Sequence, residues 1–228
     1  MDGLDLDFVR NGLITFILLV VSLAIHEWAH AFAADKLGDD TPRLQGRVTL
    51  NPLVHIDTLG TLIVPLFGIF VLRGSFALIG WGRPVITNPS NFQHRRRDDI
   101  MSTLAGPGAN FALALLGVFA GAYLVPIAPR LGELLSRLII MNVALAVFNL
   151  LPIPPLDGGH VMRYLVGMSE ETYMLISRWS GWVLLLAINL AFVRNLFTVI
   201  FMFACWPYLY LAQWLNPAAM PLLFPILR

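Results

Sequence analysis

Five apolar stretches constrain the fold of this chain more than any other feature of its sequence. Each is long enough to cross the hydrocarbon core of a bilayer, which takes about 20 helical residues. Hydrophobic residues make up 57% of the 228 residues and charged residues only 13%, and a water-soluble chain of this length could not bury so much apolar surface. The sequence therefore predicts an all-α polytopic membrane protein, with spans near residues 11–34, 101–125, 137–156, 174–193 and 196–215.

A sixth apolar stretch, residues 58–73, is shorter and is interrupted by Pro65 and Gly68. The interruption indicates either a kinked helix or a hairpin that enters the membrane and turns back. Basic residues are concentrated in 35–100, so the positive-inside rule places this region on the cytoplasmic side and the acidic N-terminus outside. A full crossing by the sixth stretch would put Arg95–Arg97 outside. The charges therefore favour a re-entrant element.

Composition argues against two other kinds of site. The formal net charge of +1 gives no reason to expect nucleic-acid binding, and none is predicted. The single cysteine, Cys205, can form neither an internal disulfide nor a zinc site built from several thiolates.

The first apolar stretch contains a His-Glu-x-x-His motif at residues 26–30. In a helix, His26 and His30 lie one turn apart on the same face, so both imidazoles can reach one metal ion. Glu27 is rotated off that face but is close enough to hold a metal-bound water and to accept its proton. Ionisable side chains inside a spanning segment are costly unless they have partners or a function. The motif therefore predicts a catalytic metal centre.

Two histidines do not complete such a centre, because catalytic zinc generally has three protein ligands and a water. His55, His94 and His160 are candidates for the third ligand, together with the carboxylates near the spans. Asp157 stands out because three prolines precede it and two glycines follow it. The prolines free backbone groups that lipid does not tolerate unless they line a polar cavity, and the glycines allow close backbone approach.

The depth of the ligands predicts how their segments run. His26 lies about 15 residues into its helix and Asp157 about 20 residues after the start of its own segment, so both are towards the C-terminal ends. They can share a metal ion only if the two segments run in the same direction. One crossing between them, by 101–125, gives that arrangement, whereas a second crossing by 58–73 would not. The positions of the ligands and of the basic residues therefore both indicate that 58–73 does not cross the membrane.

Together, these motifs resemble the site-2 protease family of intramembrane zinc metalloproteases, in a minimal form without a PDZ domain. The resemblance covers roughly residues 10–165. The motifs that carry it, in the family's order, are His26–His30, Gly46–Pro52, Gly60–Leu62, Gly80–Val85, Ala105–Asn110, Asn149–Pro152 and Leu156–Gly159.

The resemblance implies one zinc ion, held by His26, His30 and Asp157, with Glu27 as the general base. Asn149 matches the family's asparagine and is expected to hold the substrate backbone or the developing oxyanion. An asparagine at this position could instead cap the broken helix.

For three other polar residues the sequence favours structural roles. Asn110 follows a proline and two glycines and is expected to serve helix packing. His160 is expected to support the site or the fold and not to bind the metal, because the ligand set is already complete. His55 is expected to stabilise its loop.

The resemblance also implies the architecture. A three-helix metalloprotease core is expected, with a re-entrant, partly β element after the first helix and two additional C-terminal transmembrane helices. Those two helices could guard substrate entry or only pad the core. The expected parts are a core at 1–165 with spans 11–34, 101–125 and 137–156, a re-entrant and partly β region at 45–85, and a helix pair at 166–228.

The leading hypothesis is an endopeptidase of a prokaryotic cell membrane with its active site towards the cytoplasm. It would cleave transmembrane segments of membrane-anchored proteins, with a regulatory partner or a preceding site-1-type protease as a further expectation. A metal transporter is a second hypothesis, but it would need more ionisable residues along a path through the membrane. An inactive scaffold is a third, and the intact Glu27 speaks against it.

Overall fold

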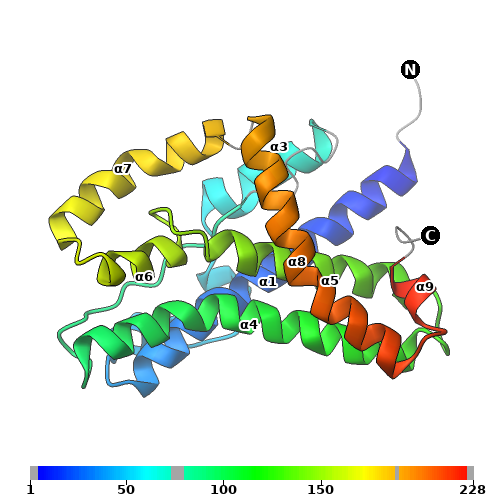
Figure 1. Cartoon of the computed structure of the whole chain (residues 1–228), viewed down its shortest axis with the longest axis horizontal. Helices are drawn as coiled ribbons and strands as arrows, with labels where there is room; N and C mark the ends of the chain where they lie inside the picture. The colour runs from blue at the N-terminus through cyan, green and yellow to red at the C-terminus, as the bar shows by residue number, and fades with distance from the viewer. Residues whose placement is uncertain (1–4, 73–79, 188–189, 225–228) are drawn as a thin grey trace.

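The computed structural model describes residues 5–72, 80–187 and 190–224, and all regular structure in these ranges is helical. The all-α prediction is thus confirmed for the described residues (Figure 1). The elements are α1 (Leu6–Lys36), α2 (Thr41–Leu44), η1 (Pro52–Val54), η2 (Thr58–Ile63), α3 (Val64–Phe70), α4 (Arg95–Leu124), α5 (Leu131–Asn149), α6 (Asp157–Leu165), α7 (Glu170–Ala187), α8 (Ala191–Leu215) and α9 (Met220–Leu223).

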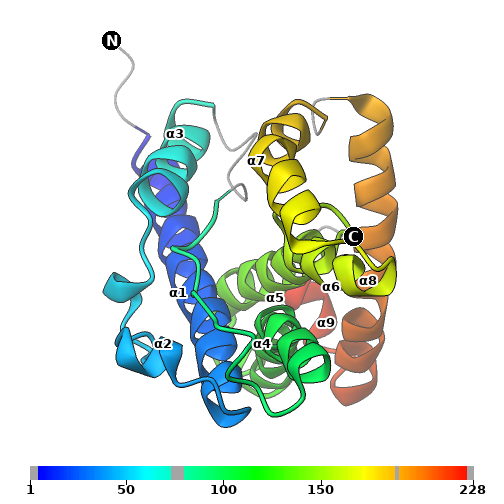
Figure 2. The same ribbon diagram turned by 90° about the vertical axis from the view of Figure 1, so that its left-hand side faces the viewer.

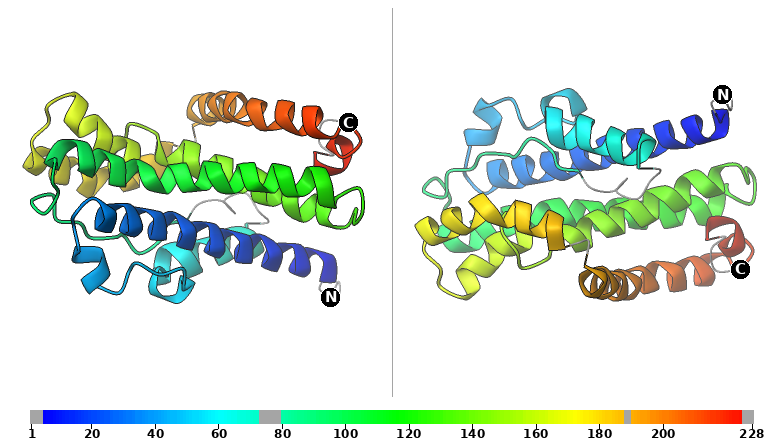
Figure 3. Two further views of the ribbon diagram at one scale, coloured as in Figure 1. Left: turned by 90° about the horizontal axis from the view of Figure 1, so that it is seen from below. Right: turned by 90° about the horizontal axis from the view of Figure 1, so that it is seen from above.

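Three long helices, α1, α4 and α5, pack against one another at the centre of the molecule. α1 and α5 run in the same direction, and α4 runs antiparallel to both (Figure 3). Small buried residues of α4, among them Gly106, Ala114 and Gly117, let the neighbouring helices approach closely. This is the relative direction that a metal ion shared by α1 and Asp157 requires.

Four helices, α1, α4, α5 and α8, are long and apolar enough to cross a membrane, which confirms an integral membrane protein. The predicted span 174–193 is not among them within the described residues. Its first part belongs to α7, whose 18 residues include three charged ones and end at Ala187. Residues 188–189 lie outside the described ranges. The helix that contains residues 174–187 begins earlier, with two glutamates, and a new helix begins at Ala191, so the observed helix boundaries differ from the predicted span.

The predicted span 137–156 is also divided. α5 ends at Asn149, and Asp157 begins the separate helix α6. The prolines between them remove backbone donors and end the first helix. Gly158 packs against the backbone of the connecting loop so closely that a Cβ there would lie 2.2 Å from the carbonyl oxygen of Leu150. The glycine thereby keeps Asp157 next to the end of α5.

Residues 58–70 form an apolar helix that begins with the π-helical turn η2 and continues as α3. At about 1.5 Å per residue it is roughly 20 Å long, shorter than a bilayer core of about 30 Å. Its end packs near the start of α1, where the rings of Phe70 and Phe8 are 6.0 Å apart. The chain then returns, because the Trp81 N–H donates to the carbonyl of Gly60 at 3.1 Å. Trp81 therefore lies beside the start of this helix.

The β character predicted for 45–85 is not found in the described residues of that range, which contain helices and irregular segments. The apolar part is helical instead, and a helix satisfies its backbone groups without a neighbouring strand. Residues 73–79 of this prediction lie outside the described residues. The returning segment keeps single bonds to the loop before η2, such as the Arg83 N–H to the His55 carbonyl at 2.8 Å.

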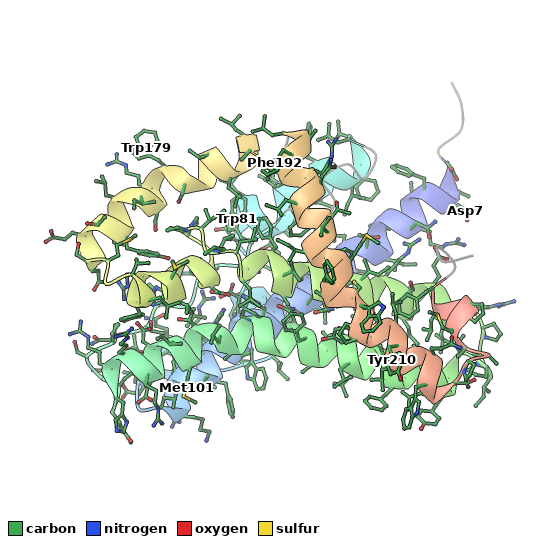
Figure 4. All side chains as sticks on the ribbon, in the orientation of Figure 1. Asp7, Trp81, Met101, Trp179, Phe192 and Tyr210 are labelled. Carbon is green, nitrogen blue, oxygen red and sulfur yellow. The ribbon has the colours of Figure 1, made fainter. Side chains whose placement is uncertain are left out.

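The other helices surround this centre. Figure 2 shows α3 alongside α1, with α7 and α8 on the opposite side of the molecule. α8 packs on α4 and α5, where Ala114, Val143 and other apolar side chains form the largest buried cluster. Trp179 of α7 and Phe192 of α8 point outwards in Figure 4 and are 63% and 76% exposed. Such a surface suits lipid, because lipid tails are as apolar as these side chains.

The turn after α1 is tied to the segment before α4 by Asp39, which is fully buried. Its carboxylate accepts hydrogen bonds from Thr41, from the Asn88 N–H at 2.7 Å and from Asn91 Nδ2 at 2.9 Å. Burial would by itself raise the pKa of Asp39, but these hydrogen bonds outweigh it and hold the pKa below its ordinary value of 3.8.

Asp39→Asn is expected to destabilise the protein at pH 7 by about 2 kcal/mol, because a charged hydrogen-bond acceptor is lost. The carboxylate stabilises the fold above its unfolded pKa, and this contribution is lost as the pH falls through the lower, folded pKa. Thermal unfolding in detergent should therefore differ between wild type and variant at pH 7 and converge as the pH falls below the folded pKa of Asp39. Asp40→Asn, at the exposed neighbouring position, should unfold like wild type. A difference that is the same at every pH would contradict this role.

Candidate metal centre

His26 and His30 project from the face of α1 that packs against α4. His26 is only 4% exposed. The two rings are 4.6 Å apart, and their Nε2 atoms are 3.0 Å apart. The spacing of four residues, one helical turn, is what brings the two imidazoles together.

Asp157, the first residue of α6, brings a third donor atom to the same point. Its Oδ2 lies 3.3 Å from His26 Nε2 and 3.4 Å from His30 Nε2. Among the described residues, these three form the group of histidine and carboxylate side chains that could hold a metal ion. The structure thus brings together the three ligands that the sequence suggested.

The tautomer of His30 follows from its second nitrogen. His30 Nδ1 is 2.8 Å from the backbone carbonyl oxygen of Ser102. A carbonyl oxygen can only accept, so Nδ1 carries a proton, and in the neutral imidazole Nε2 presents a lone pair.

The tautomer of His26 follows from a chain of buried amides. Asn142 Nδ2 donates to the Leu138 carbonyl at 2.9 Å, which leaves Asn142 Oδ1 to accept from Asn110 Nδ2 at 2.8 Å. Asn110 Oδ1 therefore faces His26 Nδ1, at 2.6 Å. The proton of His26 lies on Nδ1, and its Nε2 is also a free lone pair. Ser22 completes the chain by accepting from Asn142.

These residues fit a zinc ion. In the neutral imidazoles two unprotonated nitrogens face a carboxylate oxygen, and Asp157 Oδ2 is buried without a hydrogen-bond partner in the described part of the chain. Such an arrangement is repulsive until a cation neutralises it. Tetrahedral zinc with bonds of about 2.0–2.2 Å places its donor atoms roughly 3.3 Å apart, and the three distances here are 3.0, 3.3 and 3.4 Å.

Gly106 of α4 closes the other side of the centre. A Cβ at this position would lie 2.2 Å from His30 Nε2 and 2.8 Å from His26 Cε1. Only a glycine lets α4 approach both imidazoles at this distance.

Glu27 is 8% exposed and lies beside Gly82, in the irregular segment 80–85 that follows α3 in the chain. A Cβ on Gly82 would be 2.8 Å from Glu27 Oε1. The buried guanidinium of Arg47 fixes this segment by donating to the carbonyls of Arg83 at 2.6 Å and Pro84 at 2.9 Å. Burial, followed by the charge of Arg83, lowers the pKa of Arg47. Arg47 therefore fixes the position of the backbone that lies next to Glu27.

The remaining candidates make their hydrogen bonds to other groups than the three ligand atoms. Asn149 donates to the Leu145 carbonyl of its own helix at 2.9 Å, which is the helix-end contact, and its expected role towards the substrate stays a prediction. His160 faces Asp99 at 3.0 Å. His55 contacts the carbonyl of Thr49 within its own loop, as expected for a loop-stabilising residue.

The sequence predicts a helix-packing role for Asn110, and its motifs do not single out Ser102 or Asp99. One signal could have found them: Asp99, Ser102, Gly106 and Asn110 are three or four residues apart, on one face of an apolar helix. Buried polar residues at that spacing in a membrane-spanning helix indicate partners or a function.

Comparisons with known proteins place this geometry in context. The sequence model of peptidase family M50 matches residues 126–188. The chain is 36% identical over 180 residues to a Bacillus subtilis protein named "Putative zinc metalloprotease YwhC", covering 75% of this chain and 78% of that protein. It is 32% identical over 198 residues to Rip2 of Mycolicibacterium smegmatis, similarly named, covering 82% of this chain and 73% of that protein. No solved structure matches the chain.

Proposed function

The chain belongs to peptidase family M50, the site-2 protease family of zinc metalloproteases, and from this membership and the geometry of the centre we propose that it is an intramembrane endopeptidase. Its proposed substrates are transmembrane segments of membrane-anchored proteins. The observation that carries the proposal is the convergence of two imidazole Nε2 atoms and an unpartnered carboxylate oxygen among apolar helices, with Glu27 directly after His26 on α1.

We assign the zinc ligands to His26, His30 and Asp157. When bound, zinc supplies a Lewis acid that lowers the pKa of water and polarises a peptide carbonyl. The protein's own contribution is orientation. The carbonyl of Ser102 and the amide of Asn110 fix the two imidazole tautomers, and such outer contacts hold ligands in the geometry the metal needs.

Glu27 is the proposed general base. It follows His26 directly, so its carboxylate leaves α1 at the edge of the centre and not within it. From there it would take the proton of the attacking water and deliver it to the leaving nitrogen of the cleaved peptide bond. Glutamate is suited to this task because it can be charged before the attack and neutral after it.

The irregular segment 80–85 is the proposed binding place for the substrate backbone. Trp81 bonds to Gly60 of η2 and Arg83 to His55 in the loop before it, and in an extended chain the residue between them points its backbone groups the opposite way. Gly82 would then present an N–H and a carbonyl beside Glu27 to an unwound substrate. Asn149 is proposed to assist, since its amide has a second N–H besides the one given to Leu145.

The basic residues of 35–100 support an orientation with the N-terminus outside and the active site towards the cytoplasm. The apolar stretch 58–73 is proposed to enter the membrane from that side and return. Substrate selection is proposed to depend on access through the membrane, on a regulatory partner or on a preceding cut by a site-1-type protease.

The test of the metal assignment is Asp157→Ala. The purified full chain in detergent is expected to bind one zinc ion and to cleave members of a panel of single-span membrane proteins. The variant should lose most of its zinc and its cleavage activity together, because two imidazoles remain in place of three ligands. Bound zinc is measured by mass spectrometry and cleavage by gel electrophoresis.

Asp7→Ala removes an exposed carboxylate at the other end of α1 and should change neither quantity. Full zinc content in Asp157→Ala would show that the ligand set is wrong. Zinc binding by wild type without cleavage of any panel member would favour the transport or scaffold hypotheses.

A further inference from the structure

A buried cluster of polar side chains joins α6 to the first turns of α4. Asp99 of α4 is 1% exposed and lies at its centre. Its Oδ2 accepts from His160 Nε2 at 3.0 Å and from the hydroxyl of Tyr164, and it lies 3.6 Å from the guanidinium of Arg163. One carboxylate oxygen therefore holds three side chains of the same short helix.

Aromatic contacts make this cluster compact. The Arg163 guanidinium lies 4.6 Å from the ring of Tyr164 and 5.4 Å from that of Tyr173 on α7. The His160 ring meets Tyr164 and Tyr173 edge-on, at 5.8 Å and 5.5 Å. Each side chain thus limits the rotation of its neighbours, and the bonds to Asp99 set the orientation of the group.

The cluster begins one helical turn after Asp157. His160 is the third residue after Asp157, so both lie on neighbouring parts of the same face of α6. α5 ends at Asn149, and an irregular loop connects it to α6. The position of the Asp157 carboxylate is therefore decided by how α6 docks, and α6 packs mainly on α4.

The same face of α4 contacts the other two proposed ligands. Ser102 holds His30 and Asn110 holds His26, one and three turns beyond Asp99. The third proposed ligand has no such direct contact from α4 among the hydrogen bonds of the described residues. Asp99 stands at the position from which α4 can orient it through α6.

We propose that Asp99 is a positioning residue of the metal centre: through His160 and Tyr164 it fixes α6 and thereby places Asp157 against His26 and His30. This inference rests on the proposed function. Asp99 does not touch the ligand atoms, and its effect passes through the first two turns of α6.

The test is Asp99→Asn in the purified full chain, loaded with zinc in detergent. The rate at which zinc passes to an excess of a coloured chelator is expected to rise about tenfold or more, as for other residues that orient metal ligands. The matched control is Asp98→Asn. Asp98 is equally buried, but its carboxylate bonds to the His94 N–H and to Arg97 at the start of α4. This control should lower the unfolding temperature and leave zinc release unchanged.

A double variant tests whether the effect of Asp99 on Asp157 passes through His160. Each single variant, Asp99→Asn or His160→Gln, should release zinc faster than wild type. In the double variant the two increases in rate should not multiply, because both single changes break the same contact. Independent, multiplying effects would overturn the path. If Asp99→Asn does not fold, wild-type zinc release from His160→Gln overturns the inference by itself.

Zinc measurements on two variants distinguish the role of Asp99 from the assignment of the zinc ligands. Wild-type zinc release from Asp99→Asn, in a preparation where Asp157→Ala loses zinc, would overturn only the role of Asp99. Zinc retained by Asp157→Ala would overturn the ligand assignment on which the inference rests.

Discussion

Glu27→Gln is expected to keep the zinc content of wild type and to lose cleavage activity by a factor of about 10³ or more. A general base typically contributes factors of about 10²–10⁴. Glutamine has the same size and can occupy the same space beside Gly82, so the packing next to the imidazoles should not change. It cannot accept the proton of the attacking water at neutral pH. Zinc content and cleavage are measured on the same preparation.

The matched control is Glu133→Gln. Glu133 lies at the start of α5 and pairs with Arg137 on an exposed surface, so its loss should leave both quantities near wild type. Normal cleavage by Glu27→Gln would show that another group activates the water. Loss of zinc together with activity would show that Glu27 supports the metal site.

Gly106→Ala is expected to abolish zinc binding and cleavage together. The added methyl group would lie 2.2 Å from His30 Nε2 and 2.5 Å from His30 Cε1, on the atom proposed to bind the metal. His30 cannot simply turn away, because its Nδ1 is held by the carbonyl of Ser102. Either the imidazole leaves its position or α4 moves away from α1. Zinc content, cleavage and thermal unfolding measured together describe the result.

Gly108→Ala is the control, because it makes the same change on the same helix two residues later. A Cβ at this position meets nothing within 4 Å. Since glycine is less favourable than alanine within a helix by roughly 0.5–1 kcal/mol, this variant should be slightly more stable than wild type and equally active. Zinc binding by Gly106→Ala at the level of wild type would mean that the three side chains do not hold the metal as they lie here.

Local patterns were sufficient for much of the fold. Long apolar stretches predict membrane helices because lipid leaves the backbone few alternatives, and α1, α4, α5 and α8 are helices of this kind. Within the described residues the predicted span 174–193 is not among these helices, because α7 includes three charged residues and α8 begins anew at Ala191.

In the proposed site, too, some residues follow from local spacing and others only from tertiary contacts. His26, Glu27 and His30 follow from spacing within one helix, which is a local property. Asp157 required an argument about direction, and the structure brings it to the two imidazoles. Asn110 was assigned to packing, because a sequence does not show which side chain a residue faces across a helix interface. Its bond to His26 joins residues 84 positions apart.

The sequence by itself determined the class of the protein, most of its membrane helices and the two histidines proposed to bind zinc, because apolar length and helical period act over one or two turns. Only the tertiary structure decided that 58–70 is helical and not β, that Asn110 and Ser102 fix the two imidazoles, and that Asp99 faces α6. These contacts depend on how closely α4 approaches α1 and α6. That distance is set by the packing of small residues from several helices at once, which no local pattern contains.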